Sequence, residues 1–449
     1  MHHASPPIWS QSSSIWSAVR VHSAAGDILQ HHRRTMNGLL QFGLLFVSFF
    51  LQPTSFGTAF TLSPPRGLPY ETIADLARKR YSNNRDGGEE PPMKGRVAVI
   101  TGAAGGIGGE LSRAVFRLGG TVIALDRNTA GLEALQRNLV DADNDNVNDG
   151  DNDNDNDARD RIVLLQTNHE DLSSVASAAE SILSRFDRID LLINNAGIAY
   201  GTDQAKKPAM VSAHGKDLAF TVNYLSHFLL TEKLMPSLSS EGRVVHITST
   251  FHWKVDGNDL VPSGEEGVPP AYQSDPSKQG PNHADRSYAN TKLAQLWHSR
   301  SIGKLLPTGC SSVCACPLWA ATGIGGESAR DLLGSYAFAV SDCGPGVTSA
   351  LNAVLRSDDE LGDARNDGRS FVANANVVDY DSLRAVLAVI TPLGWRDTFM
   401  NLTSVYLLFS QRYFHEDFLI QKTSPESFED EEKRDRFYQW SKDEVNEWL

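Results

Sequence analysis

The sequence predicts an α/β fold in which a doubly wound, parallel sheet forms a single domain behind a disordered N-terminal leader. The main observation is an alternation of short apolar runs with longer segments of helical pattern, which starts at about Lys94. Such runs are typical of parallel strands that are buried on both faces and joined by crossover helices. The second observation is a glycine-rich turn that directly follows the first apolar run.

Six apolar runs predict the strands of this sheet. In chain order they are "RVAVI" (96–100), "TVIAL" (121–125), "RIVLL" (161–165), "DLLIN" (190–194), "RVVHI" (243–247) and "SSVCAC" (311–316). Polar insertions at 141–160 and 254–286 interrupt the alternation. The first lacks the apolar residues that folding requires and is interpreted as an acidic low-complexity linker. The second borders the expected substrate cleft and is predicted to be either a lid or a surface loop.

The folded domain is expected to span residues 94–449, behind a targeting leader and linker at 1–93 that is mostly unstructured. The apolar segment 38–51 has about the length of a signal-peptide core and is short for a membrane span. A basic stretch with hydroxyl residues follows it, and the whole resembles the bipartite plastid-targeting leaders of algae with complex plastids. The alternatives are a secretory signal for the endoplasmic reticulum and a retained segment that associates with a membrane.

Composition excludes some classes of function. The chain has 449 residues, a net charge of −14 and 41% hydrophobic residues. Nine Asp and one Arg fall in 141–160, so this insertion carries more than half of the net negative charge. Nucleic-acid binding would require clustered Lys and Arg, so no binding to nucleic acid is expected. The four cysteines have no metal-binding spacing, so no metal site is predicted.

The glycine-rich turn predicts a dinucleotide site and thus a Rossmann-type sheet. Gly102, Gly106 and Gly108 lie between an apolar strand and a helical pattern, where glycines let a pyrophosphate approach a helix N-terminus. Asp126 ends the second strand, where a carboxylate would bind the ribose hydroxyls and repel a 2′-phosphate. Arg127 beside it would attract such a phosphate. The sequence favours NAD, with NADP as the alternative.

A tyrosine and a lysine four residues apart predict an acid/base pair, because four positions make about one helical turn. Tyr288 and Lys292 in "SYANTKLAQL" have this spacing, and so have Tyr438 and Lys442 in "YQWSK". The spacing alone therefore does not identify the pair that carries chemistry.

Taken together, the motifs resemble those of the short-chain dehydrogenase/reductase family, with the retinol-dehydrogenase-like members closest in texture. The resemblance runs from about Lys94 to the C-terminus. Its motifs are "TGAAGGIG", "NH" (168–169), "NNAG" (194–197), "FTVNYLSHFLLT", "VVHITS", "SYANTKLAQLW" and "CPLWAAT". The closing "FYQWSKDEV" resembles the end of retinol-dehydrogenase-like chains, which makes Tyr438 and Lys442 the decoy pair.

The resemblance implies a set of site residues. The catalytic residues would be Tyr288, Lys292, Ser249 and Asn223. The cofactor-binding residues would be Gly102, Gly106, Ile107, Gly108, Asp126, Arg127, Asn168, His169, Asn195, Ala196, Gly197, Tyr288, Lys292, Pro317 and Thr322.

Each catalytic residue has an expected role. Lys292 is predicted to lower the pKa of the Tyr288 phenol from its ordinary value of about 10, so that the phenol exchanges a proton with the substrate. Ser249 would bind the substrate oxygen. By the resemblance, Asn223 would hold a water that relays protons from the lysine.

The sequence therefore predicts an oxidoreductase that transfers hydride between a nicotinamide cofactor and an alcohol or carbonyl substrate, which is expected to be hydrophobic. Dimers and tetramers are common in the family, so the resemblance leaves an oligomer open, and the sequence does not reveal the oligomeric state. Leu318 departs from the family pattern, because a glycine usually follows the proline at 317. A catalytically weak NAD(P)-binding protein, acting as a sensor or partner, is the alternative function.

Overall fold

The computed structural model describes residues 70–81, 91–144, 158–199, 211–264, 266–275, 277–278, 283–317, 324, 347–375 and 415–449. All of them belong to one compact unit, Ser63–Leu449. Among these residues, no helix is both long and apolar enough to cross a membrane. The segment 38–51, on which membrane association was considered, lies outside the described residues.

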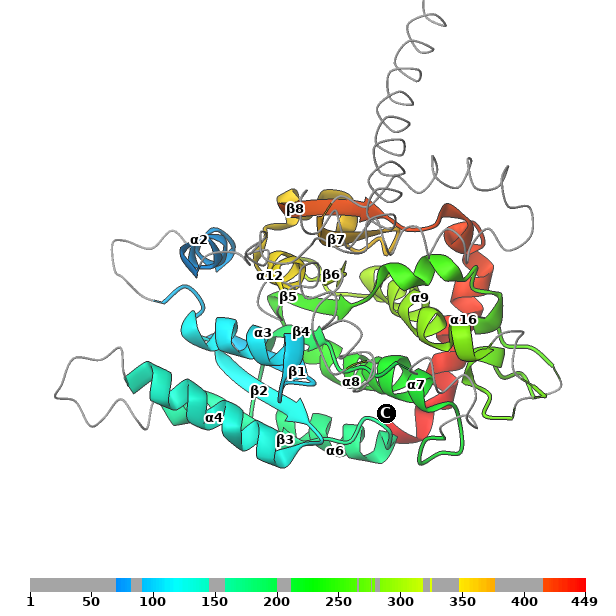
Figure 1. Ribbon diagram of the computed structural model, residues 1–449, viewed down its shortest axis with the longest axis horizontal. Coiled ribbons are helices and arrows are strands. Elements are labelled where there is room, and N and C mark those ends of the chain that lie inside the picture. Colours follow the sequence, from blue (N-terminus) through cyan, green and yellow to red (C-terminus); the bar gives the residue numbers. More distant parts are fainter. Residues whose placement is uncertain are drawn as a thin grey trace, which may run out of the picture. The chain divides into compact units, whose positions relative to one another are not determined.

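The sheet has eight strands in the order β3-β2-β1-β4-β5-β6-β7-β8 (Figure 1). Neighbouring strands from β3 to β7 are parallel, and β8 runs antiparallel to β7. The strands are β1 (Val97–Thr101), β2 (Thr121–Asp126), β3 (Ile162–Gln166), β4 (Ile189–Asn194), β5 (Leu238–Ile247), β6 (Ser311–Ala315), β7 (Ser370–Ala375) and β8 (His415–Lys422). The chain reverses its direction of winding between β1 and β4, and ligands of such sheets bind at the carboxyl ends of strands at this point.

Helices cover both faces of the sheet. One apolar core contains side chains of α6 (Leu172–Leu183), α8 (Ser226–Leu234), α9 (His283–Gly303) and α16 (Glu431–Glu444), and the other those of α2 (Tyr70–Tyr81), α3 (Gly106–Arg117), α4 (Thr129–Asn144) and α12 (Thr348–Leu355). The shorter helices are α7 (Leu218–Phe220), η2 (Thr221–Leu225), η3 (Met235–Ser237), η4 (Thr250–Lys254), η5 (Asn258–Leu260), η6 (Pro270–Tyr272), α13 (Asp358–Leu361), η8 (Gly362–Ala364), η9 (Pro425–Phe428) and η10 (Asn446–Trp448).

The first strand shows why the apolar runs formed strands. Val97 and Val99 contact one core, whereas Ala98 and Ile100 contact the other. All four side chains are buried because successive residues of a strand point to opposite faces, and both faces are covered. All six predicted runs are strands, and the prediction of a doubly wound α/β sheet is confirmed.

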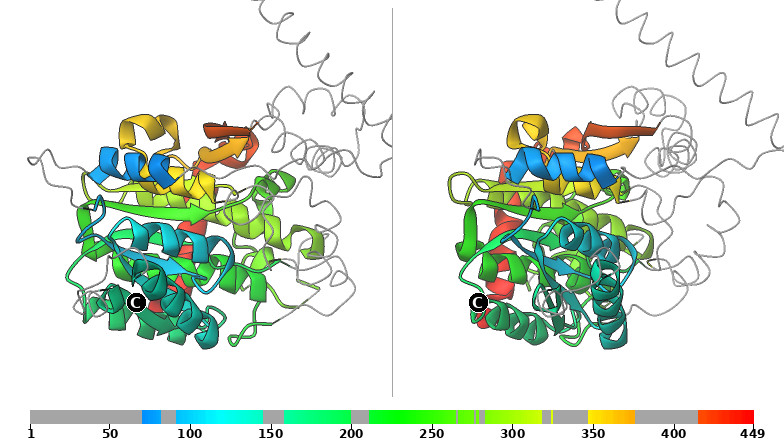
Figure 2. Two further views of the ribbon diagram at one scale, coloured as in Figure 1. Left: turned by 60° about the vertical axis from the view of Figure 1, so that its left-hand side comes forward. Right: turned by 90° about the vertical axis from the view of Figure 1, so that its left-hand side faces the viewer.

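The structure adds elements that the pattern did not predict. Strands β7 and β8 extend the sheet, and helix α2 packs against α12 from within the range expected to be leader and linker (Figure 2). The remainder of that range lies outside the described residues, apart from 91–93. The described part of the polar insertion 254–286 is anchored in the core by Val255, Leu260, Ala271 and Tyr272, whereas residues such as 263, 264, 266 and 267 are exposed.

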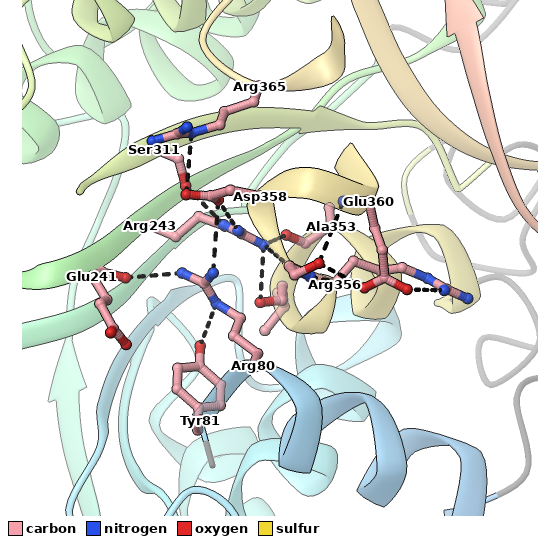
Figure 3. Close-up of polar contacts among 12 residues, drawn as sticks. Arg80, Tyr81, Glu241, Arg243, Ser311, Ala353, Arg356, Asp358, Glu360 and Arg365 are labelled. Atoms are coloured by element: carbon pink, nitrogen blue, oxygen red, sulfur yellow. Dashed lines mark hydrogen bonds and ion pairs between the residues drawn. The ribbon is translucent and has the colours of Figure 1, made fainter. Parts of the chain in front are cut away.

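A buried arginine organises the edge of the sheet opposite the glycine turn. Arg243 of β5 donates to Ser311 Oγ (2.9 Å) and to the carbonyl oxygens of Ala353 (2.8 Å) and Arg356 (2.7 Å), and it pairs with Asp358 (Figure 3). Arg80 of α2 lies 3.7 Å from the same carboxylate. Helix α2 is therefore held to the Arg243–Asp358 pair by a polar contact as well as to the core by its apolar face.

Candidate active site

The glycine turn brings β1, α3 and β4 into close contact. Gly102 and Gly106 have φ of +66° and +58°, a backbone region that residues with a Cβ rarely adopt. A Cβ on Gly108 would lie 2.2 Å from the carbonyl oxygen of Gly102, so only glycine permits this approach of helix to strand. Ile107 between them is buried in the second core. Each predicted glycine thus has a backbone reason for its place in the turn.

The "NNAG" segment is fixed to this turn by a threonine that the sequence analysis did not single out. Thr101 Oγ1 accepts hydrogen bonds from the backbone amides of Asn195 and Ala196, both at 2.9 Å. Asn195 Nδ2 donates to the Thr101 carbonyl oxygen at 2.8 Å. The structure therefore brings Gly102, Asn195 and Ala196 together at the carboxyl ends of β1 and β4. The first letter of "TGAAGGIG" was the available signal.

Asp126 is directed towards the glycine turn. Its carboxylate accepts from the backbone amides of Ala104 (3.1 Å) and Asn128 (2.9 Å). Arg127 is 70% exposed and lies 3.8 Å from Glu170, so an anionic neighbour partly offsets its charge. The carboxylate is held in place, whereas the guanidinium extends into solvent.

Asn168 and His169 follow β3, as predicted, but the histidine ring is directed inward. Asn168 Oδ1 accepts from the Glu170 amide at 3.3 Å, and the Asn168 amide donates to Ser174 Oγ at 3.0 Å. The His169 ring is 6% exposed, and its Nδ1 lies 2.8 Å from Ser226 Oγ. A contribution of His169 to cofactor binding would therefore come from its backbone amide rather than from its ring.

Asn223 lies in a single π-helical turn, η2, an irregularity that is frequent at functional sites. Its side-chain amide accepts from the Ile198 amide and donates to the Ile198 carbonyl oxygen, both at 2.8 Å. It also donates to Thr291 Oγ1 at 3.1 Å. A Cβ on Gly197 would contact Asn223 Oδ1 at 3.4 Å. Asn223 thus anchors the loop after β4 and leaves its main-chain carbonyl for other partners.

Ser249 and Tyr288 lie together beyond the end of β5. The Ser249 hydroxyl lies near enough to the Tyr288 phenol to lower its pKa, and it accepts from the Phe251 amide at 3.3 Å. The phenyl ring of Phe251 packs edge-on against the tyrosine, with 5.9 Å between ring centroids. A substrate oxygen between the two hydroxyls would meet two hydrogen-bonding groups at once.

Lys292 lies beneath the tyrosine, with its Nζ 5.4 Å from the centre of the Tyr288 ring. It is buried, and its ammonium donates to the Ile247 carbonyl oxygen (2.7 Å) and to Gln295 Oε1 (3.2 Å). Burial lowers the pKa of Lys292 to about 8, although Cys316 and Cys314 act in the opposite direction.

The expected lowering of the tyrosine pKa is wrong for the chain by itself. Burial raises the pKa of Tyr288 above its usual value of 10, the nearby Cys316 adds to the rise, and the Ser249 hydroxyl only partly offsets it. Desolvation of the phenolate outweighs the attraction of an ammonium several ångströms below the ring. Tyr288 is therefore a protonated phenol at neutral pH.

The decoy pair has different surroundings. Tyr438 of α16 donates to Glu232 Oε1 at 2.7 Å, and the half-exposed Lys442 lies 4.0 Å from the same carboxylate. Burial raises the pKa of the Tyr438 phenol, the carboxylate of Glu232 adds to the rise, and both disfavour proton release. Of the remaining predicted residues, Pro317 is buried after β6, and Thr322 lies outside the described residues together with Leu318.

The comparison with known proteins agrees with this arrangement. A family model described as short chain dehydrogenase matches residues 96–255, from β1 to beyond Ser249. This part of the chain is similar to short-chain dehydrogenases, and the relatives of the whole chain include proteins named retinol dehydrogenases. The matched region holds the glycine turn, Asn223 and Ser249, and it ends before Tyr288.

Three relatives illustrate which proteins this chain is similar to. The dehydrogenase/reductase SDR family member FEY of Arabidopsis thaliana is 30% identical over 55% of this chain and 60% of its own length. Short-chain dehydrogenase TIC 32 A, chloroplastic, of Brassica napus is 28% identical over 47% and 58%. Human retinol dehydrogenase 14 is 29% identical over 51% and 62%. The chain spans less than two thirds of the length of each of these relatives.

The residues present fit the nicotinamide cofactor that the family binds. Gly105 precedes α3 and has nothing within 4 Å of the position of a Cβ, so the N-terminus of this helix is open to a phosphate group. The first turn of α3 carries no acidic residue that would repel a phosphate. Asp126 would bind the ribose at the adjacent strand end.

Proposed function

We propose that this protein is an oxidoreductase that transfers hydride between a nicotinamide cofactor and an alcohol or carbonyl substrate. The observation that carries the proposal is the pairing of Ser249 with Tyr288 above Lys292, at the same edge of the sheet as the glycine turn. The bound cofactor would supply or accept the hydride. The residues of this chain bind, orient and move the proton.

The protonation state of Tyr288 supports carbonyl reduction, because the protonated phenol is already in the form that this direction of the reaction requires. A protonated phenol donates its proton to the carbonyl oxygen as that oxygen gains negative charge. The Ser249 hydroxyl orients the same oxygen and stabilises its charge. The ammonium of Lys292 then lies where it stabilises the phenolate that remains.

The test compares the two tyrosines that share the lysine spacing. Tyr288→Phe removes the phenol proton, so we expect turnover to fall by about 100-fold or more while NADH still binds, as measured by cofactor fluorescence. Tyr438→Phe is the matched control and should keep turnover within a few-fold. Equal turnover of Tyr288→Phe and the unaltered protein would refute the proposal. NADH binding without turnover of any carbonyl by the unaltered protein would instead support the sensor alternative.

We also propose NAD rather than NADP as the cofactor. The held carboxylate of Asp126 would repel a 2′-phosphate, and Arg127 is exposed and lies near Glu170. We expect kcat/KM to be higher with NADH than with NADPH, and Asp126→Ser to narrow the difference. A preference for NADPH in the unaltered protein would contradict this assignment.

Substrate, assembly and location extend the proposal. We propose a hydrophobic carbonyl or alcohol, with support from relatives named retinol dehydrogenases. A panel of aldehydes of increasing chain length tests this, and kcat/KM that falls with length would contradict it. Size-exclusion chromatography measures whether the protein is a monomer or an oligomer. We propose a plastid location, with support from a relative named chloroplastic, and a fluorescent protein fused behind residues 1–69 tests it.

A further inference from the structure

A buried glutamine connects the lysine of the site to the main chain of the π-helical turn. Gln295 lies three residues after Lys292 on α9, and its side chain is 1% exposed. Its Oε1 accepts from Lys292 Nζ at 3.2 Å, and its Nε2 donates to the carbonyl oxygen of Asn223 at 2.9 Å. One side-chain amide therefore contacts both groups that the family resemblance joined through water.

The orientation of this amide follows from its partners. An ammonium can only donate hydrogen bonds and a carbonyl oxygen can only accept them. The oxygen of Gln295 must therefore face Lys292, and its nitrogen must face Asn223. The same carbonyl oxygen lies 3.0 Å from His227 Nδ1, which must then carry a proton and donate it. Because every group in the bridge has a complementary partner, the arrangement has a single orientation.

We propose that Gln295 is a positioning residue that holds the ammonium of Lys292 beneath Tyr288 by bridging it to the carbonyl oxygen of Asn223. The proposal rests on the proposed function. A side-chain amide does not titrate near neutral pH, so it fixes the ammonium but does not carry protons.

The surroundings of Lys292 offer little that stabilises its charged form, so the bridge through Gln295 matters for that charge. The other titratable groups that act on it from the described elements are Tyr288 on the same helix, Cys314 and Cys316 on and after β6, His227 on α8 and His246 on β5. Burial lowers the pKa of both histidines well below 6.5, so they are neutral at neutral pH. With no carboxylate among these groups, the charged lysine depends on neutral acceptors, namely Gln295 and the Ile247 carbonyl oxygen.

Two substitutions separate positioning from mere packing. Gln295→Met keeps the side-chain volume and removes both hydrogen bonds. Gln295→Glu keeps an acceptor for Lys292, adds a negative charge and removes the donor to Asn223. A matched control is Asn290→Leu, which removes a buried amide of the same helix whose nitrogen donates to Asp259 instead.

The measurement is the pH profile of kcat, with thermal unfolding of each variant to account for stability. Gln295→Met destabilises the charged lysine, so kcat should fall about 10-fold or more and its alkaline limb should move to lower pH. Gln295→Glu stabilises the charge, so the limb should move to higher pH. Asn290→Leu should leave the limb in place.

Two results would overturn the inference: an unchanged kcat and limb in Gln295→Met, or a limb that moves in the same direction in the Met and Glu variants. If Tyr288→Phe is inactive in the same assay, such a result refutes the role of Gln295 and leaves the proposed function intact. If Tyr288→Phe is fully active, the proposed function fails, and the role of Gln295 fails with it.

Discussion

Acidification should destabilise the folded domain through its buried histidines, and His169 allows the size of the effect to be worked out. Ser226 Oγ donates to the Val222 carbonyl oxygen, so it must accept from His169 Nδ1. His169 Nε2 is then a buried acceptor with no partner among the described residues. Protonation of this nitrogen would bury a cation with nothing to receive its hydrogen. Burial accordingly lowers the pKa of His169 to about 4.

The sign and magnitude follow from linkage. Between the folded pKa of about 4 and the unfolded value of 6.5, the unfolded chain binds more protons, so stability falls as pH falls through 6.5. At about pH 5 this single histidine should lower the free energy of unfolding by about 2 kcal/mol relative to pH 7 or above. His252, whose pKa burial also lowers to about 4, should act in the same direction.

The assay is urea unfolding at about pH 7.5 and about pH 5 for the unaltered protein and for His169→Asn, whose amide can still donate to Ser226. The variant should lose about 2 kcal/mol less than the unaltered protein between the two pH values. Ser226→Ala is the control: it removes the hydrogen bond but leaves a titrating imidazole, so the dependence on pH should remain. The same loss of stability in His169→Asn and in the unaltered protein would refute the reasoning.

Three further predictions follow from the packing. Gly108→Ala places a Cβ against the carbonyl oxygen of Gly102. NADH affinity, measured by fluorescence titration, should fall at least 10-fold, and the free energy of unfolding in urea should fall by about 2 kcal/mol or more. Unchanged values would contradict the close approach of α3 to β1. A protein that begins at residue 67 should be about 3 kcal/mol more stable than one that begins at residue 91, because α2 buries Leu76 and Tyr81. Equal melting temperatures of the two proteins would show that α2 contributes nothing to stability. Arg243→Met should lower the free energy of unfolding in urea by about 3 kcal/mol, because it leaves buried carbonyl oxygens and a carboxylate without their donor. An unaltered unfolding midpoint would contradict this prediction.

Much of the fold could be read from local sequence. The six apolar runs became strands because a strand covered on both faces must be apolar at nearly every position, which leaves a continuous signal. The glycines were recognisable because their backbone angles and close contacts exclude other residues. Strand β8, "HEDFLIQK", was missed because an edge strand with charged residues carries no such run.

The site was only partly predictable for a related reason. The sequence places Tyr288 and Lys292 on one helix turn, but the pKa of the phenol depends on how much water the surrounding elements exclude, and that exclusion is a property of the packed structure. The decoy shows the same limit, since Glu232 comes from a different helix than Tyr438. Likewise, the bridge made by Gln295 needs a carbonyl oxygen from a turn that is remote in sequence.

The sequence by itself determined where the six apolar strands and the glycine turn lie along the chain, and which residue types stand at the expected cofactor site. These features depend on backbone angles, periodicity and residue chemistry. The tertiary structure decided which hydroxyl meets Ser249, in which direction the tyrosine pKa moves, and what holds the lysine. These depend on desolvation and on contacts between segments far apart in the chain, and both arise only when the two faces of the sheet are packed.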